Sequence, residues 1–465
     1  MIHQPPDWAD QEFGITMTDC RPQMSATLAG GARLLCAHPD VSFSQACGNA
    51  RRGLSRILHD RRLNCHTMLA GHRAATEQRI QNSQQTDFLL PSDTVFFTYV
   101  GHQATTGLTP LQGKVNGIVQ HNVMVLEAKG GLPLGVLAVH NWARGGHQDT
   151  LAKESDKWAM GLDQANDLGQ RWPERRFTVV NDRESDMLDF FKKPRRPNVH
   201  FIVRVSQPRR YEQVSAEAQA RTRQQVTQLV ETAAGLPLLG HHEVTVYRAN
   251  RPVTLTLQLQ ASAVRVLPPK DKSEALHSVD DVNLVVAREV AARDDRGQDV
   301  FQSEQAAEWL LLTSLPIDTL AEVTFVVTSY ASRWRIERLH YTMKSGALNS
   351  ERLQFDEVGT LCNALVLNTI VAWQLLLLCY EARQEPPVDV QQCLTQEQIA
   401  VLRIMAKGPL DTIQQASLQI GLLVNFEPSR KQPLPGVRKL ASGLRQLNAM
   451  CELYRQMRIT KTVPT

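Results

Sequence analysis

Five side chains that could bind metal or phosphate crowd the stretch YASRWRIERLHYTMKSGA, residues 330–347. They are Tyr330, Arg333, Glu337, His340 and Lys344. An α-helix turns about 100° per residue, so the last four lie roughly 300°, 340°, 280° and 320° from the first, within an arc of about 80°. A carboxylate ringed by such donors is typical of a site where the acid holds a metal ion and its neighbours hold phosphate oxygens.

A metal site of this kind needs further oxygen ligands, and two aspartates could supply them. Asp182 follows the apolar segment FTVV, so we expect it at the carboxyl tip of a strand, where open α/β sheets bind ligands. Asp93 heads a second strand-like segment, DTVFFTYV. Each also has a plainer interpretation, Asp182 as a helix cap and Asp93 as a turn residue. Glu184 and Asp186 are predicted to cap or support the site rather than to bind metal.

These motifs resemble the DDE transposases of bacterial insertion sequences, in the group called the IS-four, or Tn-five-like, family. That family carries Tyr, two residues, Arg, three residues, Glu, six residues and Lys on one helix, and the stretch from Tyr330 to Lys344 matches without a gap. Its Asp-Arg-Glu-Ala-Asp motif is similar to DRESD at 182–186. Its Asp-Thr-Thr strand and Gly-His-x-Ala-Thr hairpin resemble DTVFFTYVGHQATTGL. Likenesses from DWADQEFG to PGVRKLASGLRQL extend the resemblance over nearly the whole chain.

The resemblance implies a cut-and-paste transposase that hydrolyses DNA strands at inverted-repeat ends and transfers them into target DNA. It implies two Mg²⁺ ions, with Mn²⁺ tolerated, and three catalytic metal ligands: Asp93, Asp182 and Glu337. Phosphate contacts are expected from Tyr330, Arg333, His340 and Lys344. The implied partners are double-stranded DNA and, in the synaptic complex, a second copy of the chain; the implied location is the bacterial cytoplasm, at the nucleoid.

Trp309 opens the segment WLLLTSLP and occupies the place of an aromatic residue on which relatives stack a flipped base during hairpin formation. A core tryptophan on a strand is an equally open interpretation. A hairpin intermediate is therefore a hypothesis.

The segment ARRGLSRILHDRRLNCH, residues 50–66, gathers five arginines: Arg51, Arg52, Arg56, Arg61 and Arg62. They predict a surface that contacts the DNA ends. A solvated helix face is an equally open interpretation.

Two other functions stay open at this point. Val95 replaces the family's second Thr, and Ser55 and Ala441 depart from its N- and C-terminal blocks. These changes would suit a catalytically silent DNA-binding protein derived from a transposase. A ribonuclease-H-like nuclease without joining activity is the other alternative.

The elements that must position these residues follow an α/β order. Strands are predicted at 93–100, 121–128, 134–143, 176–182 and 198–206, with helices at 150–172 and 184–191. This order indicates a ribonuclease-H-like core of the retroviral-integrase superfamily. The expected domains are a helical DNA-end-binding domain (1–82), the catalytic core (83–206 and 307–385), an inserted mostly-β subdomain (207–306) and a helical, dimerising C-terminal domain (386–465). Two long helices are predicted at about 318–345 and 358–383, and a polar helical stretch at 215–234.

Composition limits the class of protein to which the chain can belong. The 465 residues are 42% hydrophobic and 21% charged, as in ordinary globular proteins. The net charge of +4 neither requires nor excludes a nucleic-acid partner. Eight scattered cysteines fit free thiols in a reducing compartment. The apolar run at 361–380 contains Asn363, Asn368 and Gln374, so we expect a buried core helix, not a membrane span.

Overall fold

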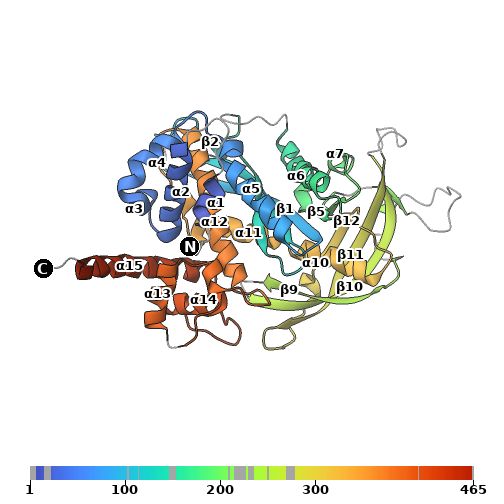
Figure 1. Cartoon of the computed structure of the whole chain (residues 1–465). Coiled ribbons are helices and arrows are strands. Elements are labelled where there is room, and N and C mark those ends of the chain that lie inside the picture. Colours follow the sequence, from blue (N-terminus) through green and yellow to red (C-terminus); the bar gives the residue numbers. More distant parts are fainter. Residues whose placement is uncertain are drawn as a thin grey trace. The chain divides into compact units, whose positions relative to one another are not determined.

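Strand β1 (Asp87–Thr98) is shared between two compact units of the chain. The computed structural model describes residues 7–14, 22–101, 104–113, 115–145, 153–207, 210–213, 227–228, 235–248, 251–268, 278–406 and 408–462 (Figure 1). Unit 1 comprises residues 1–84, 94–150 and 336–465, and unit 2 comprises residues 85–93 and 151–335. The fold is mixed α/β with a large mixed sheet. The four predicted domains have other bounds than these two units, and that division stays a prediction.

Unit 1 contains three antiparallel strands and a set of helices. Its first helices are α1 (Trp8–Phe13), α2 (Pro22–Ala37), α3 (Phe43–Cys47), α4 (Arg51–Leu58) and α5 (Cys65–Asn82). Its strands are β2 (Thr109–Gln112), β3 (Val115–Glu127) and β4 (Pro133–Trp142), and β3 pairs antiparallel with both β2 and β4. Its later helices are α12 (Val358–Glu381), α13 (Gln396–Met405), α14 (Ile413–Leu422) and α15 (Val437–Thr462). In Figure 1 the red helix α15 extends beyond α13 and α14 to the C-terminal end of the chain.

Helix α12 forms the centre of unit 1. It is long and apolar enough to cross a membrane, but 94% of its most apolar window is buried inside the fold. Two of its polar side chains donate hydrogen bonds there: the Asn363 amide donates to the carbonyl of Leu58 at 2.9 Å, and the Trp373 indole donates to the carbonyl of Pro133 at 2.9 Å. The predicted buried core helix is therefore confirmed.

A buried polar network ties α1 to α5 and β4. Glu12 is 1% exposed and accepts from Arg79 at 2.7 Å and from the Nδ1 of His72. The backbone N–H of Val136 donates to the Nε2 of His72 at 2.8 Å, which requires a neutral imidazole. Burial lowers the pKa of His72, and the neighbouring His72 and Arg79 lower the pKa of Glu12 against the opposing effect of burial. The carboxylate is thus held ionised beside a neutral histidine.

Unit 2 is built on a sheet that changes from parallel to antiparallel. The first half of β1 pairs parallel with β5 (Arg176–Asn181), and β5 pairs parallel with β6 (Val199–Arg204). The sheet continues antiparallel through β12 (Glu308–Thr313), β11 (Val279–Asp294) and β10 (Arg251–Val266). Strands β9 (Gly240–Arg248) and β7 (Arg210–Gln213) pair with β10, and β8 (Thr227–Gln228) pairs with β7.

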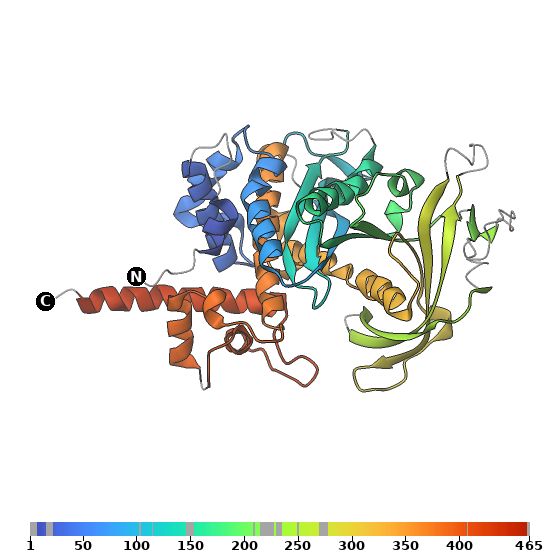
Figure 2. The ribbon, with the colours of Figure 1, turned by 45° about the vertical axis from the view of Figure 1, so that its right-hand side comes forward.

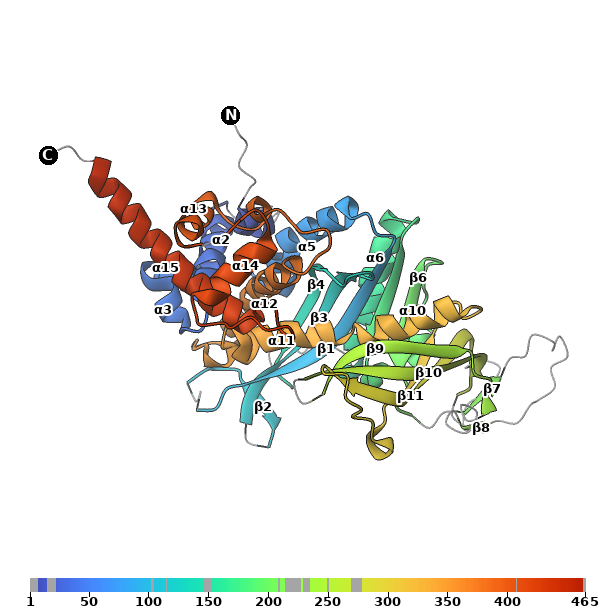
Figure 3. The same cartoon turned by 90° about the horizontal axis from the view of Figure 1, so that it is seen from below.

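Helices pack on the parallel part and on the antiparallel part of this sheet. Helix α6 (Ala159–Arg171), after the short turn at Glu154–Trp158, packs on β5 and is drawn in green in Figure 2. Helix α7 (Leu188–Phe191) connects β5 to β6. Helix α10 (Leu320–Ala331) lies along the long strands β9, β10 and β11 (Figure 3).

Most predicted strands are confirmed, with β4, β5 and β6 matching within about a residue or two. Strands β1 and β3 begin earlier than predicted, at Asp87 and Val115, so Asp93 lies inside β1 instead of at its head. The inserted region is mostly β where it is described. Of the stretch predicted to be helical at 215–234, only Thr227–Gln228 lies among the described residues, and this pair is a strand.

Candidate functional site

Two parallel strands of unit 2 bring Asp93 and Asp182 to the same level. The β1–β5 register runs from Asp87 opposite Arg176 to Pro91 opposite Val180. Pro91 has no backbone N–H to continue the ladder, and the pairing stops there. Asp93 and Asp182 are each two residues beyond this last pair, on strands that lie about 4.8 Å apart. Register therefore brings the backbones of two aspartates that are far apart in sequence to the same level of neighbouring strands.

Opposing effects act on the pKa of Asp182 at the end of β5. Its Oδ1 accepts from the N–H of Glu184 at 2.9 Å, so it does cap the short helix Arg183–Ser185, as the plainer interpretation predicted. Burial raises the pKa of Asp182, while the Glu184 N–H and the charge of Arg333 act in the opposite direction. A carboxyl with a raised pKa binds a cation only after losing its proton, which makes the site sensitive to acid.

The positive charge of Arg333 lies near both aspartates. Its Nη1 lies 3.5 Å from the Oδ2 of Asp93, and both side chains are mostly buried, at 16% and 17% exposure. Arg333 also lowers the pKa of Asp182 by its charge. Within unit 2, Arg333 thus contacts Asp93 and acts on Asp182 through its charge.

The prediction of one continuous helix at 318–345 is wrong. Helix α10 ends at Ala331, and α11 (Trp334–Tyr341) begins after a turn at Ser332 and Arg333. The Ser332 hydroxyl donates to the carbonyl of Thr328 at 3.0 Å, a local bond that competes with helical geometry and bends helices. The shared arc of about 80° therefore does not exist, because it required an unbroken helix.

Tyr330 and Trp309 lie together at the end of α10 and on β12. Their ring centroids are 5.4 Å apart in an edge-to-face arrangement. Tyr330 is only 7% exposed, whereas Trp309 is half-buried. The contact suits both a core tryptophan and an aromatic residue that stacks a base, so the flipped-base role of Trp309 stays a prediction.

Lys157 is a site residue that the sequence reasoning missed. It is 4% exposed, its ammonium lies 3.2 Å from a carboxylate oxygen of Glu184, and its charge lowers the pKa of Asp182. A lysine in a polar segment is usually exposed, so the sequence does not predict that Lys157 is buried. Its burial results from the packing of the turn before α6 against the end of β5.

Asp186 has a structural role, as predicted. It is 2% exposed and its Oδ2 accepts from the backbone N–H groups of Ser206 and Gln207, both at 2.8 Å. These bonds fix the chain that leaves β6.

The remaining predicted residues belong to unit 1. Glu337 is exposed on α11. His340 is 8% exposed and its Nε2 lies 3.0 Å from the amide nitrogen of Asn122, so its burial opposes the predicted phosphate contact. Lys344 lies in the π-helical turn Thr342–Gly346, donates to the carbonyl of Phe96 at 3.0 Å and pairs with Glu351 at 3.1 Å.

The arginines of the N-terminal cluster are all exposed. Arg62 is held by the carboxylate of Asp60 through contacts of 2.7 and 2.9 Å. Arg51, Arg52 and Arg56 lie on α4, a helix without an acidic residue. Their DNA contacts stay a prediction.

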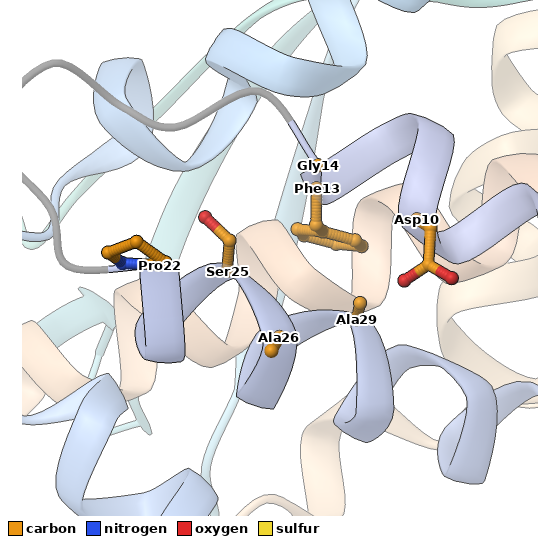
Figure 4. A pocket seen from close by; sticks show the side chains of 7 residues that line it. All are labelled: Asp10, Phe13, Gly14, Pro22, Ser25, Ala26 and Ala29. Carbon is orange, nitrogen blue, oxygen red and sulfur yellow. The ribbon is translucent and has the colours of Figure 1, made fainter.

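A small pocket lies between α1 and α2 in unit 1. Figure 4 shows its lining: Asp10, Phe13, Gly14, Pro22, Ser25, Ala26 and Ala29. Its only carboxylate, Asp10, is paired with Arg33. The rest of the lining is apolar except for the buried Ser25, and it includes no histidine, cysteine or lysine, so the pocket gives no basis for a catalytic site.

Within the described ranges, no group of three or more His, Cys, Asp or Glu side chains is assembled to hold a metal ion. Asp93 and Asp182 nevertheless fit a hard divalent cation in donor chemistry, since both offer carboxylate oxygens. The third predicted ligand, Glu337, belongs to the other unit and stays a prediction.

No protein-family model matches the chain. A cryo-electron microscopy structure of the piggyBac transposase synaptic complex with hairpin DNA is weakly similar to it, with a TM-score of 0.36 and 8% sequence identity. The match covers 98% of this chain and 81% of that one.

Proposed function

We propose that the chain is a metal-dependent DNA transposase of the DDE type, with a ribonuclease-H-like core. The observation that carries the proposal is the register of β1 and β5, in which Asp93 and Asp182 each follow the last paired residue by two positions, together with the contact of Arg333 with Asp93. The spacing of the Tyr-Arg-Glu-Lys and Asp-Arg-Glu motifs in the sequence supports the same function.

In this proposal Asp93, Asp182 and Glu337 hold the metal ions. Bound divalent ions would supply positive charge to the attacking and leaving oxygens of the phosphoryl transfer. Arg333 balances the carboxylates by its contact with Asp93, and its guanidinium is suited to a phosphate oxygen when DNA is bound. Lys157, close to Asp182, helps to keep that carboxyl ionised.

The partner would be double-stranded DNA, contacted by the exposed arginines of α4. A homodimer would form on the DNA through the C-terminal region. Helix α15 supports this part of the proposal, because Leu453 and Met457, one turn apart, are 61% and 63% exposed.

Cleavage of a supercoiled plasmid tests the proposal. The plasmid carries the DNA that flanks this coding sequence on both sides, and the reaction is started with Mg²⁺. We expect Asp93→Asn, Asp182→Asn and Glu337→Ala each to lower cleavage by at least about 100-fold while binding to the DNA ends is largely kept, since only the metal ligands change. Asp163→Asn, an exposed acid on α6, is the matched control and should cleave normally.

Cleavage by Glu337→Ala at the wild-type rate would refute the assignment of Glu337. Binding of Mn²⁺, followed by electron paramagnetic resonance, gives a readout that is independent of turnover, and the aspartate variants should bind more weakly. A strand-transfer reaction with pre-cut ends separates a transposase from a nuclease that cuts without joining.

A further inference from the structure

Phe96 is an exposed aromatic residue on the strand that carries Asp93. It is 40% exposed, whereas its neighbours Val95 and Phe97 are 7% and 0% exposed. A buried strand that turns one phenyl ring to solvent leaves a flat apolar surface uncovered in unit 1.

One cation borders this ring. The guanidinium of Arg144 lies 5.5 Å from the ring centroid, and its Nη1 donates to the carbonyl of Leu111 at 3.0 Å. Lys344 donates to the backbone carbonyl of Phe96 at 3.0 Å, but its charge is paired with Glu351 at 3.1 Å. The ring is therefore flanked by one guanidinium that is anchored to a backbone carbonyl.

Two further exposed apolar residues lie just beyond the end of β1 and at the start of β3. Val100 is 79% exposed and Val115 is 39% exposed. The N–H of Tyr99 donates to the carbonyl of Asn116 at 2.9 Å, which brings these two valines close together in space.

We propose that Phe96 and Arg144 form a stacking platform for an unpaired DNA base. Bases stack on aromatic rings whatever their sequence, and a guanidinium over the ring adds a cation–π contact and attracts the phosphate backbone. A second copy of this chain would suit the cationic border less well, because like charges would meet across the contact. The platform is distinct from Trp309, which lies on β12 of unit 2, and the proposal rests on the proposed function in DNA cleavage.

Binding of two matched DNA probes to the full-length protein tests the platform. One is a blunt duplex, and the other is the same duplex with a five-nucleotide single-stranded extension whose first base is 2-aminopurine. The wild type should bind the extended probe more tightly and quench its fluorescence. Phe96→Leu, which keeps apolar bulk without a ring, should weaken binding of the extended probe roughly five- to 150-fold and leave the blunt duplex unaffected. Phe96→Trp should retain the preference, and Arg144→Gln should reduce it.

Equal wild-type affinity for the two probes, or a preference that survives in Phe96→Leu, would overturn the platform. A wild-type dimer that Phe96→Leu dissociates, measured by light scattering without DNA, would assign the surface to a second copy and also overturn it. The plasmid reaction is run in parallel. If the wild type cleaves the plasmid but binds both probes equally, only the platform is refuted. If it prefers the extended probe but does not cleave the plasmid in Mg²⁺, only the transposase function is refuted.

Discussion

The Glu12 network makes a quantitative prediction about how the N-terminal helices are held. Glu12→Gln keeps the shape of the side chain but removes the charge that Arg79 and His72 contact. Breaking a buried ion pair on one side costs about 2 to 4 kcal/mol, because the remaining cation and hydrogen-bond donor lose their charged acceptor. Arg79 is 22% exposed, so water compensates part of the loss and the lower half of that range is expected.

Urea unfolding followed by tryptophan fluorescence measures this effect. Trp373 reports on the site directly, since its ring lies 4.6 Å from that of His72 and 4.3 Å from the guanidinium of Arg79. The m value grows with chain size, so for 465 residues it should exceed the roughly 1 to 3 kcal/mol/M of small proteins, and the midpoint should fall by about 0.5 M. The matched control is Arg33→Gln, which breaks a surface pair between the same helix and Arg33 and should cost less than about 1 kcal/mol.

Acid should weaken the same network in the wild type. Both pKa values are lowered in the folded protein, so the stabilisation is present above the ordinary values and is lost as the pH falls, first below the ordinary 6.5 of histidine and then below the 4.5 of glutamate. A Glu12→Gln midpoint within about 0.2 M of the wild type at neutral pH, or a larger loss in Arg33→Gln, would refute the reasoning.

Three further predictions concern DNA. Arg333→Gln should move the acid limb of Mg²⁺-dependent cleavage to higher pH, because the lost charge no longer lowers the already raised pKa of Asp182; an unmoved limb in a pH–rate profile would contradict this. Replacing Arg52 and Arg56 by Gln should weaken DNA binding and lower the slope of log affinity against log salt by about two, measured by fluorescence anisotropy across salt concentrations. An unchanged slope would assign these arginines to a solvated face. Exchanging Leu453 and Met457 for Glu should prevent dimer formation on DNA without lowering the thermal midpoint, and a persistent dimer in analytical ultracentrifugation would exclude α15 from the contact.

The sequence predicted best those elements whose residues are buried all round. Strands β4, β5 and β6 and helix α12 are continuous apolar runs, and their bounds match closely. The start of β1 was missed because Pro91 and Ser92 resemble a strand break, although Ser92 is fully buried inside the strand.

The site was only partly predictable for a different reason. Residue types and spacing made Asp93, Asp182 and Arg333 candidates, but their levels on neighbouring strands depend on strand register, which is a tertiary property. The break at Ser332 and Arg333 falls in a segment whose helical residue pattern continues on both sides, so periodicity does not reveal it. The burial of His340 depends on Asn122, which lies far away in the sequence.

The central place of α12 has a consequence for synthesis of the chain. Helices α2, α4 and α5 and strand β4, against which α12 packs, are all translated long before residue 358. Until α12 emerges, these elements expose the apolar surfaces that it will cover, and Asn363 cannot yet satisfy the carbonyl of Leu58. Polypeptides that stop short of residue 381 should therefore aggregate or be degraded, so that only a ribosome that has finished most of the message releases a folded unit 1.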